Sequence, residues 1–217
     1  PDCNEITERR IFAPMTDACF FPATAMPDWD WWRQLWPDPE GVLGELGVAA
    51  GMAAVDLCCG DGYFTAPLSR MVGVDGRVYG LDIDPRMLAA ARAHVDNHGL
   101  DNCVWIEADA LDLAGHVPEA IDLVLIANTF HGVGDKTGLA RRAAGVLRPG
   151  GSFCIVNWHA RPREETPVLG QPRGPATEMR LSPAAVGEAV EPAGFVLGSV
   201  VELPPYHYGA VFRKQGD

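Results

Sequence analysis

The sequence lacks the segments that would tie a chain to a membrane or direct it out of the cell. It has no apolar run of the roughly 18 residues that a spanning helix requires. It also lacks a positively charged start followed by an apolar stretch and a small-residue cleavage site, the pattern of a secretory signal. We therefore expect a cytoplasmic protein that makes no membrane contact.

Basic residues are scarce. Lys and Arg number 17 against 29 Asp and Glu, which gives a formal net charge of -12. No run of Lys and Arg is longer than the pairs Arg9-Arg10 and Arg141-Arg142. Because such a charge repels phosphate backbones, we expect no nucleic-acid partner and favour a small molecule.

Paired C-x-x-C spacings are also missing, although there are six cysteines, at positions 3, 19, 58, 59, 103 and 154. The sequence therefore has no zinc-binding or thioredoxin-like signature, and we expect reduced thiols. Cys58 and Cys59 are neighbours in a glycine-rich stretch, VDLCCGDGYF (55–64). Because vicinal cysteines cannot easily chelate one ion together, we interpret them as small space-filling side chains and expect no metal site.

The remaining composition is that of one globular domain. The chain has 217 residues, 47% of them hydrophobic and 21% charged, which suits one full domain with a modest extension. From Val55 onward, strand-like apolar runs alternate with helix-like stretches, and this alternation predicts a parallel sheet with crossover helices. The later runs are VYGLDI (78–83), CVWIEAD (103–109), IDLVLIAN (121–128) and SFCIVNW (152–158).

Helix boundaries follow from capping residues. Asp84-Pro85 predicts a helix start, because a carboxylate accepts free N–H bonds at the N-cap and proline suits the first helical position. This helix should end near Gly99. A second helix should run from Asp135 to LRPGG (147–151), where we expect a turn into the next strand. Another should begin at Ser182-Pro183.

The last two strand-like runs are FVLGSVVEL (195–203) and YHYGAVFRK (206–214), with only Pro204-Pro205 between them. So short a link cannot carry a parallel crossover, and these strands should therefore be antiparallel.

Two segments lie outside this plan. Residues 1–50 contain a stretch with four tryptophans, for which we expect a helix docking onto the sheet, with a substrate lid as the second interpretation and dimerisation left open. These tryptophans are Trp29, Trp31, Trp32 and Trp36. Residues 160–181 are proline-rich and long for a loop. Their charged residues favour a solvated, charge-paired loop over substrate contact; they include Arg161, Arg163, Arg173, Glu178 and Arg180.

A nucleotide site is predicted where the first strand meets its helix. Gly60 and Gly62 supply a tight turn, and Asp82 lies about 20 residues further on, at the end of the second strand, where a ribose-binding acid belongs. Asp61 would repel a pyrophosphate and suits a cationic ligand. Asp109 adds an acceptor for an exocyclic amine. A nicotinamide-dependent oxidoreductase uses a similar turn and stays open as an alternative.

Taken together, these motifs resemble those of the class I S-adenosylmethionine-dependent methyltransferases, of the type 11 and type 25 kind. The resemblance covers roughly residues 42–212. Its motifs are VDLCCGDGYF, YGLDIDPRML, IEADAL, IDLVLIANTFHGV and VLRPGGSFCIVNW, in that order, followed by the closing hairpin. Cys58 stands where the family has its first glycine, and the Cys-Cys-Gly turn is similar to that of menaquinone-type C-methyltransferases.

The resemblance implies a fold and a division of the chain. The fold is α/β, a Rossmann-like sheet of seven mostly parallel strands with an antiparallel C-terminal hairpin and helices on both faces. Residues 1–50 would form a helical lid or extension, and residues 51–217 the methyltransferase domain, with 160–181 as an insertion covering the cleft.

The resemblance also implies an S-adenosyl-L-methionine site. Gly60 and its neighbours would face the methionine moiety, Asp82 would hold the ribose, and Asn128 would lie beneath the sulfonium. Asp109 and the Ala110 amide would bind the adenine. The full set of implied binding residues is Asp56, Cys58, Gly60, Gly62, Tyr63, Asp82, Ile83, Met87, Asp109, Ala110 and Asn128.

The acceptor side is expected beyond strands four and five. His131 and His159 are candidate general bases, since imidazole titrates near neutral pH. They are also candidate substrate contacts, together with Trp158 and Tyr206, although ordinary packing is the favoured interpretation of Trp158. The function we favour is transfer of a methyl group to a small-molecule acceptor by in-line displacement. A non-catalytic S-adenosylmethionine-binding protein is the other alternative.

Overall fold

The computed structural model describes residues 29–118 and 120–216, and the side chains from Trp32 onward. Cys3, Cys19 and the side chains of Trp29 and Trp31 therefore lie outside the described residues.

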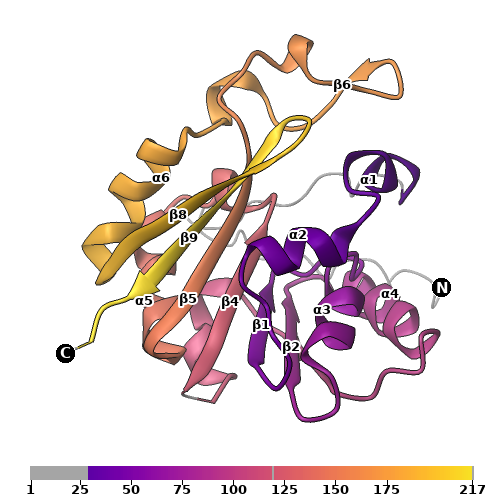
Figure 1. The fold of residues 1–217 in the computed structure, drawn as a ribbon, viewed down its shortest axis with the longest axis vertical. Coiled ribbons are helices and arrows are strands. Elements are labelled where there is room, and N and C mark those ends of the chain that lie inside the picture. The colour runs from indigo at the N-terminus through magenta and orange to yellow at the C-terminus, as the bar shows by residue number, and fades with distance from the viewer. Residues whose placement is uncertain (1–28, 119, 217) are drawn as a thin grey trace, which may run out of the picture.

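Seven strands form one mixed sheet, in the order β3-β2-β1-β4-β5-β9-β8 (Figure 1). The five strands from β3 to β5 are parallel, and β9 pairs antiparallel with both β5 and β8. The predicted mostly parallel sheet with a closing antiparallel hairpin is confirmed. The strands are β1 (Ala53–Leu57), β2 (Arg77–Asp82), β3 (Cys103–Glu107), β4 (Ile121–Ala127), β5 (Leu147–Trp158), β8 (Phe195–Leu203) and β9 (His207–Lys214).

Helices cover both faces of the sheet (Figure 1). Side chains of α5 (Lys136–Val146) and α6 (Pro183–Val190) pack into one buried apolar cluster, on the side of Phe153 and Ile155. Side chains of α1, α2 and α3 pack into the other, on the side of Cys154 and Val156, and α4 contacts α3. These helices are α1 (Trp29–Leu35), α2 (Pro39–Glu45), α3 (Thr65–Val72) and α4 (Pro85–Asp96).

The predicted helix starts are confirmed. The Asp84 carboxylate accepts from the Arg86 N–H at 2.9 Å and begins α4. Asp135 accepts from the Gly138 N–H at 2.7 Å and begins α5. The Ser182 hydroxyl oxygen accepts from a backbone N–H in the same way and begins α6.

The predicted turn at 147–151 is wrong. Here β5 begins directly at Leu147, which pairs with Ile121, and the regular register resumes at Ser152. The intervening residues form a bulge that Gly150 accommodates with a φ of 72°. Arg148 donates to the Asp122 carboxylate at 2.6 Å, so the bulge is anchored to β4 while it remains exposed.

The tryptophan-rich segment docks as a helix, as predicted. Trp36 stacks on Trp32 at a centroid distance of 5.1 Å and packs against Phe64 at 5.2 Å, next to the start of α3. Trp36 also meets His207, the first residue of β9, at 4.6 Å. A role of this segment as a lid stays a prediction.

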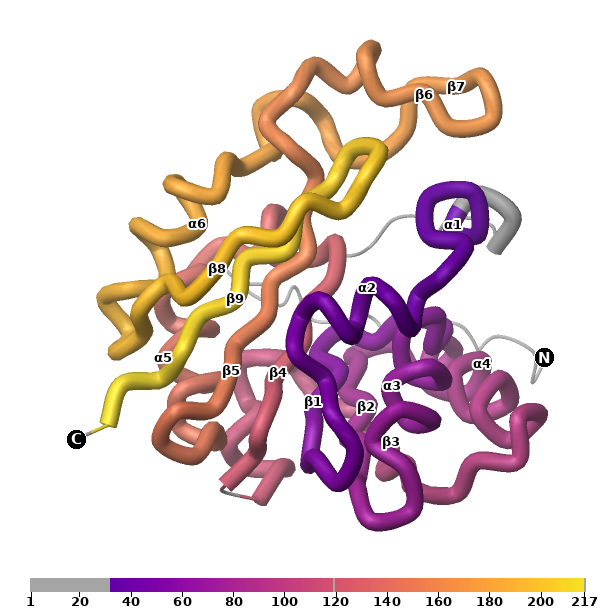
Figure 2. The backbone as a smooth tube through the Cα atoms, in the orientation of Figure 1, coloured from indigo at the N-terminus to yellow at the C-terminus, as the bar shows by residue number. Residues whose placement is uncertain are grey.

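The insertion 160–181 stands apart from the main sheet (Figure 2). It contains a two-stranded hairpin of its own, β6 (Pro167–Val168) and β7 (Gln171–Pro172), between the short helices η3 (Arg163–Glu165) and η4 (Thr177–Met179). The Tyr206 hydroxyl donates to the Pro167 carbonyl at 3.0 Å and links this hairpin to the β8–β9 turn. None of the helices described is long and apolar enough to cross a bilayer.

Asp56 joins β1 to the first turn of α3. Its carboxylate accepts from the Thr65 hydroxyl at 2.6 Å, and its side chain is buried. Burial raises the pKa of Asp56 to about 7; the Thr65 hydrogen bond opposes this shift and the charges of Asp82 and Asp61 add to it. A buried acid of this kind opposes folding when it is ionised.

Asp56→Asn should therefore change how stability depends on pH. The pKa of Asp56 is about 7 when folded against 3.8 for the free side chain, so the folded state binds more protons between these values. Wild-type stability should fall as pH rises from about 4 to about 7, by up to about 4 kcal/mol from this group. Urea unfolding at pH 5, 6, 7 and 8 should show that the free energy of unfolding of the variant rises relative to that of wild type up to pH 7. Exposed Asp75→Asn is the control, and a constant difference between Asp56→Asn and wild type would contradict the assignment.

Candidate active site

The predicted nucleotide turn lies at the carboxyl edge of the parallel strands, next to β1. From β1 the chain adds β2 and β3 on one side, and then β4 and β5 on the other. Ligands of open α/β sheets bind at this switch point. Gly62 has a φ of 86°, and a Cβ there would come within 2.8 Å of the Ala91 Cα in α4. Only glycine therefore lets the turn pack this closely against α4.

Cys58 and Cys59 fill space within this turn. Cys58 adopts a φ of 59°, the left-handed conformation that glycine favours, at the place of the family's first glycine. Cys59 is buried, and its N–H donates to the Leu81 carbonyl at 3.0 Å. Burial raises the pKa of both thiols, so both remain protonated at neutral pH. Protonated thiols are poor nucleophiles, which agrees with a packing role.

Asp82 holds the turn against the end of β2. One carboxylate oxygen accepts from the Gly60 N–H at 2.9 Å, and the other accepts from the Asp84 N–H at 2.9 Å. Each oxygen keeps a further lone pair, and the side chain is only half-buried. The carboxylate is thus fixed in position and can still accept from two ligand hydroxyls.

Asp109 stands at the end of the neighbouring strand. It caps the short helix η1 (Ala110–Gly115) by accepting from the Leu111 N–H at 2.9 Å. Capping engages one carboxylate oxygen, so the other remains an acceptor for a ligand amine. Next to it, Ile83 is 38% exposed and Met87 is half-buried, which leaves apolar surface that a flat ring can cover.

Asn128 follows β4 on the other side of the switch point. Its φ of 56° is unusual for a residue other than glycine, and its N–H donates to the Val156 carbonyl at 2.9 Å. Within the described part of the chain, its side-chain oxygen is buried without a hydrogen-bond donor. A polar atom of this kind at the edge of a site suits a ligand that supplies a donor.

Acidic residues give this edge a negative potential. After burial, the charges of Asp82, Asp56 and Asp109 raise the pKa of the Cys58 thiol, which places three carboxylates around one turn. Asp61, also buried, lies inside the turn itself. This charge disfavours the diphosphate of a dinucleotide and favours a ligand with positive groups.

Tyr63, which the resemblance places among the donor contacts, joins the turn to the tryptophan-rich segment. Its hydroxyl donates to the Trp36 carbonyl at 2.7 Å, and its ring packs against Trp32 and Phe64. The hydroxyl is thus engaged in holding α1 against the turn.

The first candidate base, His131, lies just beyond β4 and is half-buried. Burial lowers the pKa of His131 to about 4, and an interaction with Asn157 opposes the shift. The ring is thus neutral at pH 7. Asn157 is buried in β5 and pairs with Tyr208 of β9 along the strand ladder. Sequence reasoning missed Asn157, because nothing in an apolar strand marks one buried amide as a neighbour of two distant rings.

His159 begins the segment after β5. Its Nε2 lies 2.9 Å from a carboxylate oxygen of Glu202, and its ring lies 5.1 Å from that of Tyr208. His159 therefore borders Tyr208, on the side of the sheet that faces α5 and α6.

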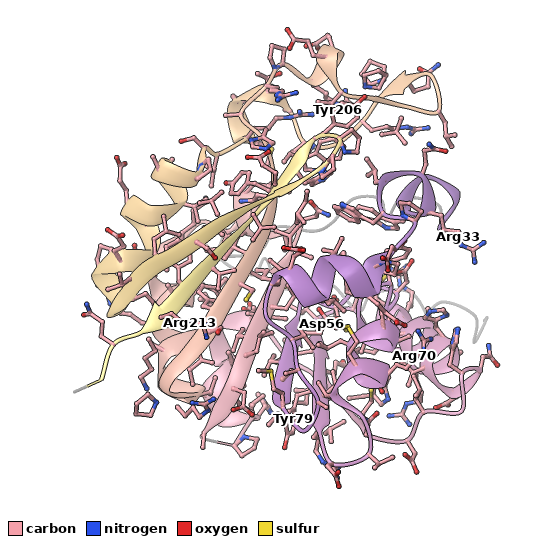
Figure 3. All side chains as sticks on the ribbon, viewed as in Figure 1. Arg33, Asp56, Arg70, Tyr79, Tyr206 and Arg213 are labelled. Atoms are coloured by element: carbon pink, nitrogen blue, oxygen red, sulfur yellow. The ribbon has the colours of Figure 1, made fainter. Side chains whose placement is uncertain are left out.

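Trp158 and Tyr206 lie together at the top of β5 and the β8–β9 turn. Their rings stack at 6.1 Å, and Figure 3 shows Tyr206 next to the insertion. Trp158 is 2% exposed and lies in the apolar core, as the packing interpretation requires, and its contact with a substrate stays a prediction. On its other side it contacts His207 at 4.1 Å.

The prediction that Arg180 belongs to a solvated, charge-paired loop is wrong. Its side chain is 6% exposed, and its guanidinium lies 4.9 Å from the centroid of the Trp158 ring. Across residues 29–118 and 120–216 it takes part in none of the ion pairs. The loop sequence gave no signal of this, because burial here depends on Trp158 and on the folding of the insertion. Arg161, Arg163 and Glu178 are exposed, as expected.

The methyltransferase-domain family model matches residues 49–180, more than half of the chain. The demethylmenaquinone methyltransferase of Geobacillus stearothermophilus is 33% identical over 117 residues, which is 54% of this chain and 50% of that protein. The ubiquinone/menaquinone biosynthesis C-methyltransferase UbiE of Hahella chejuensis is 35% identical over 54% of this chain and 47% of its own. The chain thus spans about half the length of these curated relatives.

A solved structure agrees over a larger share. The SAM-dependent methyltransferase of Aquifex aeolicus superposes with a TM-score of 0.73 at 28% identity, over 87% of this chain and 99% of its own. These matches confirm the resemblance that the glycine turn and the strand-end acids indicated, and they favour it over the nicotinamide alternative. The chain belongs to the class I S-adenosylmethionine-dependent methyltransferases.

Proposed function

We propose that this protein transfers the methyl group of S-adenosylmethionine to a small-molecule acceptor by in-line displacement. The observation that carries the proposal is the Asp82 carboxylate, fixed by the Gly60 and Asp84 amides at the switch point of the sheet. Family membership supports the same conclusion.

The residues at this edge suit the methyl donor. Asp82 would accept from the ribose hydroxyls, Asp109 from the adenine amine, and Ile83 and Met87 would cover the ring. The acidic turn around Asp56 and Asp61 would stabilise the positive sulfonium and ammonium groups. When bound, the donor supplies a methyl group that is already activated for displacement.

The protein's own task is then to position the acceptor and exclude water. Holding two reactants in line can contribute roughly 7 to 11 kcal/mol. The end of β4 at Asn128 and the buried ring of Trp158 border the region where acceptor and methyl group would meet. We assign the acceptor contacts to His131, Trp158, His159 and Tyr206.

A base is needed only where the acceptor atom carries a proton. We assign this role first to His131, because it lies just beyond β4 and its ring is neutral at pH 7; a pKa of about 4 makes it a weak base. His159 is the second candidate, and its interaction with Glu202 would orient the imidazole.

Several observations support a small, partly aromatic acceptor. The rings of Trp158, Tyr206 and Trp36 gather near the ends of β5 and β9. The relatives named above are described as acting on demethylmenaquinone or in quinone biosynthesis. A cytoplasmic location, a lid formed by residues 1–50 and a homodimer stay predictions.

Asp82→Ala should weaken binding of S-adenosylhomocysteine by about a hundredfold or more, because it removes the ribose acceptor and two charge-assisted bonds that shape the turn. Calorimetry with S-adenosylhomocysteine and, separately, NADH measures this and tests the oxidoreductase alternative. Asp75→Ala, an exposed acid between α3 and β2, is the matched control and should bind as wild type does. Unchanged affinity in Asp82→Ala, with native thermal unfolding, would remove the basis of the proposal.

The His131 ring should not titrate between pH 6 and 8. Burial lowers its pKa to about 4, since the cation loses hydration on folding. The ring resonances, assigned with His131→Asn and followed by NMR, should stay constant over this range. A midpoint near 6.5 would show that the ring is solvated and would argue against His131 as a base held neutral by burial.

Turnover separates an enzyme from a non-catalytic S-adenosylmethionine-binding protein. A panel of small acceptors, with detection of the S-adenosylhomocysteine released, should yield at least one substrate. Tight donor binding without product from a broad panel would favour the binding protein instead.

A further inference from the structure

Arg180 lies near the end of the insertion 160–181. Its guanidinium is buried and lacks a full set of hydrogen-bond acceptors. Its Nε donates to the Pro175 carbonyl at 3.2 Å. Its Nη2 donates to the Arg173 carbonyl at 2.8 Å and to the Thr166 hydroxyl at 3.0 Å. In the described part of the chain, Nη1 is buried and donates to no acceptor.

No acid balances this guanidinium. All of its hydrogen-bond partners are neutral oxygens, and none of the ion pairs among the described residues includes it. Burial, and then the charge of Arg163, lowers the pKa of Arg180, while Glu164 acts in the opposite sense with a smaller effect. A buried cation without a counter-charge destabilises the folded protein. Such an arrangement points to a ligand that supplies the missing negative charge.

His207, which contacts the same Trp158 ring, is a second buried polar group that lacks hydrogen-bond partners. It is fully buried between Trp36, at 4.6 Å, and Trp158, at 4.1 Å, and Trp158 in turn lies beneath the Arg180 guanidinium. Neither ring nitrogen of His207 has a partner among the residues described. Burial, then the charge of Arg180, lowers the pKa of His207 well below its usual range, so the ring is neutral with one donor and one acceptor.

These groups lie on the acceptor side of the edge. Trp158 ends β5, which neighbours β4, and β4 leads into Asn128. The acidic turn lies beyond β4, at the end of β1. Negative charge thus gathers where the cationic donor would bind, and an unbalanced positive charge lies across the edge from it.

We propose that the methyl acceptor is a small anion, a carboxylate attached to a flat apolar ring, whose charge pairs with the free face of Arg180 and hydrogen-bonds His207. This inference rests on the proposed methyltransferase function. The apolar ring of the acceptor packs beside Trp158. Because Nη1 is closed to solvent, the insertion must move outward for the acceptor to enter. An uncharged quinone would leave the guanidinium unbalanced.

Matched pairs of small molecules test the charge directly. The protein is first saturated with S-adenosylhomocysteine, and its affinity for this compound is recorded. Benzoate and benzamide, and 4-hydroxybenzoate and 4-hydroxybenzamide, are then titrated by calorimetry. Since hydrogen bonds to charged groups are stronger than those between neutral groups, each carboxylate should bind about tenfold or more tightly than its amide.

Variants of the insertion show whether the preference for carboxylates depends on Arg180. Arg180→Gln should abolish the preference for carboxylates, and Arg180→Lys should retain part of it. Arg161→Gln is the matched control, because Arg161 is an exposed arginine of the same insertion, and it should leave the preference unchanged. Unchanged affinity for S-adenosylhomocysteine shows that each variant is folded.

The outcomes separate this inference from the proposed function. Equal binding of carboxylate and amide by the wild type overturns it even if Arg180→Gln fails to fold, and so does an undiminished preference in a folded Arg180→Gln. Binding of S-adenosylhomocysteine without binding of any carboxylate also counts against it, while leaving the methyltransferase assignment in place. Failure to bind S-adenosylhomocysteine at all contradicts the function itself.

Discussion

The site depends on one carboxylate and two backbone amides. Asp82 accepts from Gly60 in the turn after β1 and from Asp84 at the start of α4, so it fixes the turn, the end of β2 and the next helix relative to one another. Gly62 completes this arrangement because only a residue without a Cβ fits against Ala91. The same bonds that hold the fold together at the switch point therefore also present an acceptor to the ligand.

Charge is divided along the carboxyl edge. Near β1 and β2, acids surround a turn that contains two protonated thiols, an environment suited to a cationic methyl donor. Beyond β5, the insertion brings in Arg180, whose charge no acid in the described chain pairs with. In our proposal, the choice of acceptor depends on this one buried, unpaired arginine and not on the overall net charge of -12. Opposite charges at the two ends would orient a donor and an acceptor toward each other.

The segments that meet at His207 lie outside the part of the chain that the family model matches. The curated relatives match over about half of their length, and the family model ends at residue 180. The tryptophan-rich α1 and the β8–β9 turn both lie outside that matched range, yet their side chains meet at His207. Of the residues around the proposed acceptor site, Trp36 and His207 thus lie outside the matched range, and Trp158 and Arg180 lie within it.

The sequence by itself determined the order of strands and helices, because capping residues such as Asp84 and the short Pro204-Pro205 link act locally. It also predicted the edge at which we propose that the donor binds, since Gly60 and Asp82 fall at strand ends that a parallel sheet must bring together. Only the tertiary structure decided which polar groups are buried and unpaired. Arg180 reads as a loop charge in the sequence and becomes a core cation because Trp158 and the folded insertion enclose it. Burial and charge pairing depend on neighbours distant along the chain, and no local pattern records them.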